Sequence, residues 1–121
     1  MAYTTEEVMR VVAEARARST RQWTPGNAED PMAMQTVHAE FNASLIAPEP
    51  GWIEIESHTA SILNIEEGSR MVWFVTGPKT QRVFLDESLG AFGVAWGPDS
   101  ATGKYVDLGL RTSDPIDAYL A

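Results

Sequence analysis

The chain has 121 residues, a length that fits one hydrophobic core, and we expect residues 1–121 to form a single domain. It contains no cysteine, which excludes disulfide bonds, a thiolate zinc site and a cysteine nucleophile. Its 17 acidic and 9 basic residues give a formal net charge of −8. Such a charge opposes binding to nucleic acid or anionic lipid and favours encounter with a basic partner.

The first twenty residues carry several Glu and Arg side chains, which the apolar segment of a signal peptide would not contain. No later segment approaches the ~20 apolar residues of a membrane-spanning helix. We therefore expect a cytoplasmic protein without a leader and without a membrane partner.

An amphipathic helix is predicted near the N-terminus, because Val8, Val11, Val12 and Ala15 fall at helical spacing. In the stretch TTEE, Thr4 can cap this helix and Glu7 stands at the capping-box position. The helix should end before Pro25, where the stretch TPGNAEDP has the composition of a loop.

The stretch QTVHAEFNASLI alternates apolar and polar residues from Thr36 to Leu45, which predicts a strand rather than a helix. The stretch APEPG that follows should turn the chain, because its two prolines cannot donate hydrogen bonds to a sheet. Further short strands are expected in WIEIES, ASILNI, RMVWFVT, RVFLD, FGVAW and KYVDLGL.

The stretch RMVWFVT is apolar without alternation, so we expect a central strand that is covered on both faces. The stretch GPDSATG should be a hairpin turn without a phosphate-binding or calcium-binding role. A short C-terminal helix is predicted in SDPIDAYLA, with Asp114 as cap and Pro115 in the first turn. The predicted fold class is α+β: an antiparallel sheet of about six strands with a helix at each end.

The candidates for chemistry are few, and we predict no catalytic residue, no metal site and no cofactor. His38 and His58 are the two histidines, and no ligand motif accompanies either of them. Glu54 and Glu56 share one face of the stretch WIEIES, where an acidic surface is a simpler explanation than a pair of catalytic carboxylates. Asp107 could serve a pocket or an interface, because it shares a strand face with Tyr105.

The chain contains four tryptophans, which are favoured both in cores and at the centres of interfaces. We expect Trp73 and Trp96 in the core. Trp52 has acidic neighbours and follows a proline-rich segment, so it is the best candidate for an exposed anchor of a partner.

The stretch ILNIEEGSRMVWFVTG, from Ile62 to Gly77, resembles immunity proteins of bacterial polymorphic toxin and contact-dependent inhibition systems. Proteins of this kind are small, acidic and rich in β-structure. The resemblance implies that the chain neutralises a cognate toxin, often a basic nuclease or deaminase, by binding to it.

The first functional hypothesis is therefore an acidic, non-catalytic inhibitor that docks on a basic toxin domain. The residues predicted to bind the partner are Glu40, Trp52, Glu54, Glu56, Glu66 and Glu67. A second hypothesis is a small enzyme or ligand-binding domain with a pocket between a curved sheet and the N-terminal helix, with His38, Tyr105 or Asp107 as polar groups. A third is a phage-derived or structural interaction subunit.

Overall fold

The computed structural model describes residues 2–19 and 31–121. Within these ranges the helices are α1 (Thr5–Ala17), α2 (Pro31–Ser44), α3 (Ser57–Leu63) and α4 (Pro115–Leu120). The strands are β1 (Leu45–Ile55), β2 (Gly68–Thr76), β3 (Gln81–Asp86), β4 (Ala91–Trp96) and β5 (Tyr105–Asp107). The predicted loop up to residue 30 and Trp23 lie outside the described residues. No helix in the described ranges is both long enough and apolar enough to cross a membrane.

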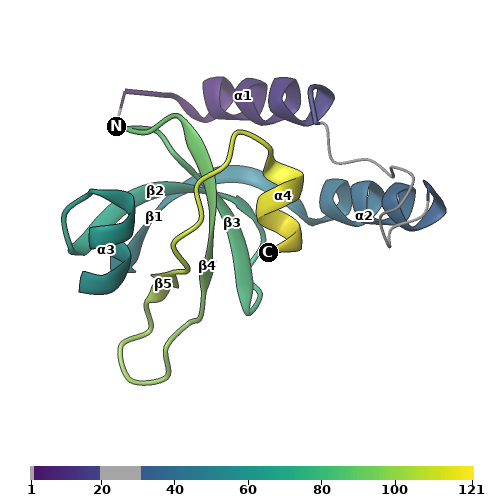
Figure 1. The fold of residues 1–121 in the computed structure, drawn as a ribbon. Helices are drawn as coiled ribbons and strands as arrows, with labels where there is room; N and C mark the ends of the chain where they lie inside the picture. Colours follow the sequence, from purple (N-terminus) through teal and green to yellow (C-terminus); the bar gives the residue numbers. More distant parts are fainter. Residues whose placement is uncertain (1, 20–30) are drawn as a thin grey trace.

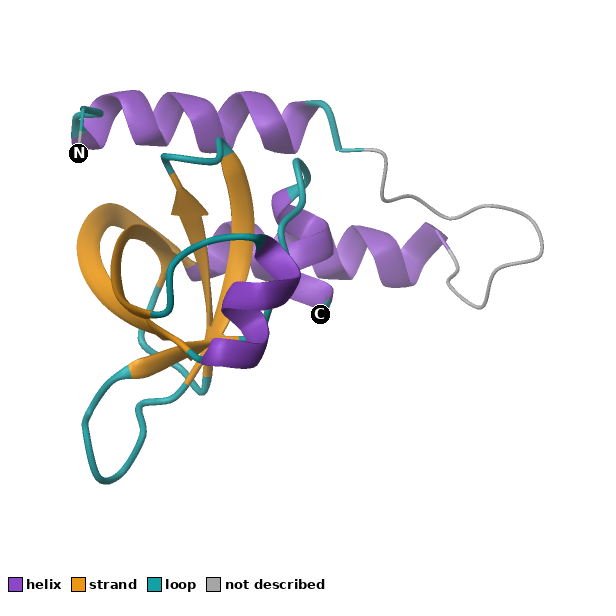
Figure 2. Cartoon of the chain, turned by 60° about the vertical axis from the view of Figure 1, so that its left-hand side comes forward, coloured by secondary structure: helices purple, strands orange, loops and turns teal. Residues whose placement is uncertain are grey.

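The five strands form a closed barrel in which each strand pairs with the next along the chain (Figures 1 and 2). The consecutive pairs are antiparallel, so β1 and β5 run in the same direction and close the barrel as a parallel pair. The α+β class and the helices at both ends are confirmed. The prediction of a sheet of about six antiparallel strands is wrong, because two of the predicted strands are helices and the remaining strands form a closed barrel.

The first helix forms where the sequence predicts it. The Thr4 side chain accepts a hydrogen bond from the Glu7 backbone N–H at 3.2 Å, and the Glu7 carboxylate accepts one from the Thr4 N–H at 3.3 Å. This capping box satisfies two N–H groups that the first turn leaves without helical partners. Val8, Val12 and Ala15 are buried against the barrel.

The strand predicted from Thr36 to Leu45 is wrong, because this segment lies mostly in α2. A period of two residues also contains the helical spacing of four, so Val37, Phe41 and Leu45 fit both patterns. These three side chains pack into the same cluster, whereas Ala39 and Ala43 are exposed. From residue 35 onward, the apolar side of α2 is therefore a narrow helical stripe that continues to Leu45 at the start of β1.

The turn predicted in APEPG is also wrong, because Pro48 and Pro50 lie within β1. Pairing with β2 is irregular between Leu45 and Glu49 and regular from Glu49 onward. Pro48 lies where this ladder is interrupted, a place in which a strand can hold proline.

The strand predicted in ASILNI is wrong as well, because most of this stretch lies in α3 and the turn that follows it. Thr59 and Ala60 are buried on one side of the helix. Ala60 and Ile65 pack against residues from inside the barrel, so α3 covers one barrel end. Asn64 ends the helix with φ of 55°, a conformation that asparagine tolerates better than most residues.

Two hydrophobic clusters lie on opposite faces of the barrel wall. Inside, Ile53, Phe74 and Phe84 belong to one cluster, and outside, Trp73 and Leu85 pack with residues of α1, α2 and α4. The central strand β2, predicted to be covered on both faces, contributes to both clusters. At Gly93 in β4, an added Cβ would lie 2.5 Å from the Phe84 ring and 2.9 Å from the Leu110 carbonyl oxygen, so the barrel interior requires glycine there.

Candidate partner-binding face

The two histidines lie on different helices. His58 is exposed on α3, and His38 is partly buried on α2. In the described parts of the chain, no group of three or more His, Asp or Glu side chains is arranged to hold a metal ion.

Asp107 belongs to a buried ionic network at the barrel end that α3 covers. Its carboxylate accepts hydrogen bonds from both terminal nitrogens of Arg111, at 3.1 and 2.7 Å, and from the Gly109 N–H at 2.9 Å. Arg111 also contacts Asp86, which accepts two hydrogen bonds from Arg70. The network has equal numbers of positive and negative groups, and both carboxylates are almost fully buried. Asp107 therefore holds the barrel together in this structure.

Tyr105 lies toward the other end of the barrel. The Arg82 guanidinium lies 4.1 Å from the centre of the Phe74 ring and 5.4 Å from that of Tyr105, and the Tyr105 hydroxyl donates to the Lys79 carbonyl. His38, Tyr105 and Asp107 were predicted as possible polar groups of one pocket. The structure places His38 on α2 and gives Tyr105 and Asp107 separate contacts, so it does not bring the three into one site.

The outer side of β4, β5 and the second half of β1 carries large apolar side chains that face solvent. Trp52, Trp96 and Leu108 are 55%, 47% and 48% exposed. The register places Trp96 opposite Val106, and Val106 opposite Glu54. We call this surface the open face and define it by Trp52, Glu54, Trp96, Val106 and Leu108.

Trp52 is exposed, as predicted, whereas the prediction of a core position for Trp96 is wrong. Trp96 is the last residue of β4, and its side chain is exposed on the outer surface of the barrel. Phe92 and Val94 lie on the same face of the strand but are buried. α4 packs against β4, but the burial that it provides does not extend to Trp96. The alternation along β4 predicts on which face of the strand Trp96 lies. Its exposure depends on how far α4, which is distant in sequence, extends over β4.

Of the acidic residues predicted to bind a partner, four lie on or beside the open face, whereas Glu40 lies elsewhere, on α2. Glu54 lies on the open face, where it accepts a hydrogen bond from Ser69 at 3.2 Å and pairs with Lys104 at 3.6 Å. Glu56 directly follows β1 and Glu67 directly precedes β2, and both are exposed.

Because Ile55 pairs with Gly68, these two glutamates and Glu66 lie at one end of the β1–β2 pair, beside the open face. Within the described residues, Glu56, Glu66 and Glu67 have no ion-pair partner. Glu40 is exposed on α2, which Figure 1 shows on the opposite side of the barrel from α3.

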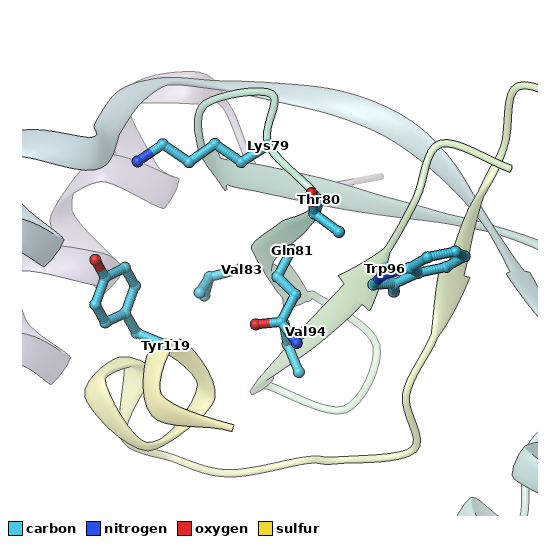
Figure 3. A pocket seen from close by; sticks show the side chains of 7 residues that line it. All are labelled: Lys79, Thr80, Gln81, Val83, Val94, Trp96 and Tyr119. Carbon is cyan, nitrogen blue, oxygen red and sulfur yellow. The ribbon is translucent and has the colours of Figure 1, made fainter. Parts of the chain in front are cut away.

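A cleft that sequence reasoning missed borders the open face at Trp96 (Figure 3). Val83 and Val94 form its apolar floor, and its volume is about 460 Å³. The polar and aromatic side chains around this floor are Lys79, Thr80, Gln81, Trp96 and Tyr119. Strand alternation places Gln81 with Val83 and Trp96 with Val94, but the contribution of Tyr119 depends on how α4 packs.

Burial raises the pKa of the Tyr119 hydroxyl above its ordinary value, and the negative charge of Glu40 raises it further. Tyr119 is therefore protonated at neutral pH and can donate a hydrogen bond into the cleft. With the apolar floor, the lysine and the amide, this arrangement is suited to holding a side chain or a small ligand.

The chain was compared with protein-family models, with curated proteins and with solved structures. No protein-family model matches the chain, and no match was found among curated proteins or among solved structures.

Proposed function

We propose that this protein is a non-catalytic binding protein, an immunity-type inhibitor that docks on a basic bacterial toxin domain. The observation that carries the proposal is the open face, where two tryptophans and a leucine are about half exposed on the outer side of the barrel. Exposed aromatic residues that gather on one face of a small protein are typical of interaction sites.

The charge around the open face supports a basic partner. Glu56, Glu66 and Glu67 are exposed beside it, and the whole chain carries a net charge of −8. Carboxylates at the rim of an interface speed encounter with a positively charged protein, while apolar residues at its centre slow dissociation. The open face combines both features on adjacent strands.

The test begins with affinity capture from the native lysate, with wild-type protein and open-face variants as parallel baits. We expect one basic protein that binds wild type and is released as salt is raised, because salt screens charges at an interface rim. With the captured protein purified, Trp52→Ala should weaken binding by at least about tenfold, the effect of removing a hot-spot side chain.

The charge contribution is measured with a matched pair of variants. Glu56→Lys combined with Glu67→Lys should slow association, because both side chains lie beside the open face. Glu6→Lys combined with Glu14→Lys changes the net charge equally on the exposed side of α1 and should have a smaller effect. Equal binding of the two charge-reversed proteins, together with wild-type affinity of the Trp52→Ala variant, would exclude the open face as the docking surface.

Inhibition is tested separately from docking. The captured protein should arrest growth when it is expressed alone, and co-expression of this chain should restore growth. Binding through the open face to a protein that does not arrest growth would retain the docking surface and reject the immunity role.

A further inference from the structure

A groove separates α1 from the junction of α2 and β1, and it lies apart from the open face. The wall that α1 supplies consists of Met9, Val12, Ala13 and Arg16, which follow one stripe of the helix. The other wall and the floor come from Asn42, Leu45, Ile46, Pro48 and Val75. The groove opens beside the start of β1, where pairing with β2 is irregular.

The groove combines an apolar lining with a positive charge. Most of its lining is aliphatic, Val12 and Val75 are buried at its base, and Met9 is 51% exposed at its edge. Among the described residues, Arg16 is the one charged side chain that lines it, in a chain whose net charge is −8. No carboxylate of the described residues pairs with Arg16. An unpaired guanidinium beside an apolar surface is suited to a ligand with a hydrocarbon body and a single anionic group.

We infer that this groove binds a medium-chain carboxylate, with its hydrocarbon chain against Met9, Leu45 and Ile46, above the buried Val12 and Val75, and its carboxylate on Arg16. The Asn42 amide, which lines the same groove, can supply a further hydrogen bond to the carboxylate. The groove has a volume of about 360 Å³. At about 30 Å³ for each water-sized group, such a volume holds about twelve non-hydrogen atoms, the number in decanoate.

The probe is sodium decanoate below its micelle concentration, titrated into the purified full-length protein by calorimetry. Decyltrimethylammonium, which has the same chain length and the opposite charge, is the matched ligand control. Decanoate should bind at least about tenfold more tightly than this cation, the effect of one charge-assisted hydrogen bond. Equal affinities for the two ligands, or no binding of decanoate, would overturn the inference.

Three variants locate the ligand. Arg16→Gln should reduce decanoate affinity by about tenfold and leave the affinity for the cation no weaker. Arg18→Gln removes the same charge at an exposed position that does not line the groove, and it should bind as wild type does. Ala13→Phe fills the groove from an exposed helix position and should abolish binding of both ligands. Equal losses in the Arg16 and Arg18 variants would contradict the role of Arg16.

A second measurement does not depend on the variants. Decanoate should shift the methyl resonances of Val12 and Val75 in wild-type protein and leave those of Val106 on the open face unchanged. Shifts that are confined to other methyl groups would place the ligand elsewhere and overturn the inference, even if calorimetry detects binding.

Discussion

Tyr119 shows how one side chain connects the cleft with Glu40 of α2. Its hydroxyl is partly buried at the edge of the cleft, and the carboxylate of Glu40 is near enough to raise its pKa. Loss of hydration disfavours the phenolate, and a neighbouring negative charge disfavours it further. The pKa therefore reports two properties, the burial contributed by the cleft and the charge contributed by α2.

We predict that Tyr119 titrates above the ordinary value for tyrosine and that Glu40→Gln lowers its pKa partway back. The folded protein holds the Tyr119 proton more tightly than the unfolded chain does, so its stability should fall as pH rises through the folded-state pKa. Phenolate absorbance measured against pH gives the titration, and Tyr119→Phe identifies the step that belongs to this residue. An unchanged titration in the Glu40→Gln variant would exclude the electrostatic contribution.

Among single residues, the sequence predicts those whose environment depends on near neighbours. Trp52 was recognised as exposed because prolines and acids surround it in the chain. Asp107 stood out, but its pairing with Arg111 and the further link to Asp86 require folding of segments that no local pattern relates. The groove beside Arg16 was missed because one wall comes from α1 and the other mainly from the start of β1, and the sequence does not reveal that these segments lie side by side.

At the scale of elements, α4 depends on its cap more than a longer helix would, because a helix of two turns is not stable alone. The Asp114 carboxylate accepts a hydrogen bond from the Ile116 N–H at 2.9 Å. Its second oxygen accepts one from the Ser19 hydroxyl at 2.7 Å, which ties the end of α1 to the start of α4.

We predict that Asp114→Ala lowers the free energy of unfolding by about 1 kcal/mol, the usual cost of a lost helix cap, or more because the link to Ser19 is also lost. Asp114→Asn keeps an acceptor oxygen and should cost less. Urea unfolding followed by circular dichroism measures both variants, with Ser113→Ala as an exposed neighbouring control. Equal destabilisation by Ala and Asn would show that capping is not the main role of Asp114.

The helices predicted correctly are those with local signals at their ends. α1 has a capping box and α4 has an aspartate followed by a proline, and each set of signals lies within one turn of the helix. α2 was predicted as a strand because its stripe of every fourth residue is also part of a period-two pattern. The choice between the two was made by packing, since Phe41 is fully buried and contacts the α4 side chain Tyr119.

At the scale of the whole molecule, closure of the barrel rests on a short strand. β5 has three residues, and its pairing with β1 consists of two residue pairs, Ile53 with Tyr105 and Glu54 with Val106. Such a short ladder leaves few backbone hydrogen bonds to hold β5 in place. Side chains supply the remaining contacts, because Asp107 in β5 is joined through Arg111 to Asp86 in β3 and from there to Arg70 in β2. The sequence predicts an α+β protein but not this closure, which joins segments far apart in the chain.

We predict that Arg111→Met destabilises the protein by about 3–5 kcal/mol, because it leaves Asp86 and Asp107 buried without their shared cation. The guanidinium also lies 4.9 Å from the centre of the Phe84 ring inside the barrel, and methionine keeps only part of that contact. Asp86 keeps its pair with Arg70, so Asp107 is the carboxylate left without a cation. Adding Asp107→Asn to Arg111→Met removes that charge and should recover part of the loss. Urea unfolding gives the free energies, with Arg10→Met on the exposed side of α1 as control.

Hydrogen exchange then separates loss of closure from uniform weakening. If the network holds β5 against β1, the amides of Tyr105–Asp107 should lose protection in the Arg111→Met variant before those at the centre of β2. A loss below about 1 kcal/mol with protected β5 amides would mean that the β1–β5 backbone pairs close the barrel alone. The open face spans this same seam between β1 and β5, so a variant with an open seam should also lose the arrangement of Trp52, Val106 and Trp96 that we propose for docking.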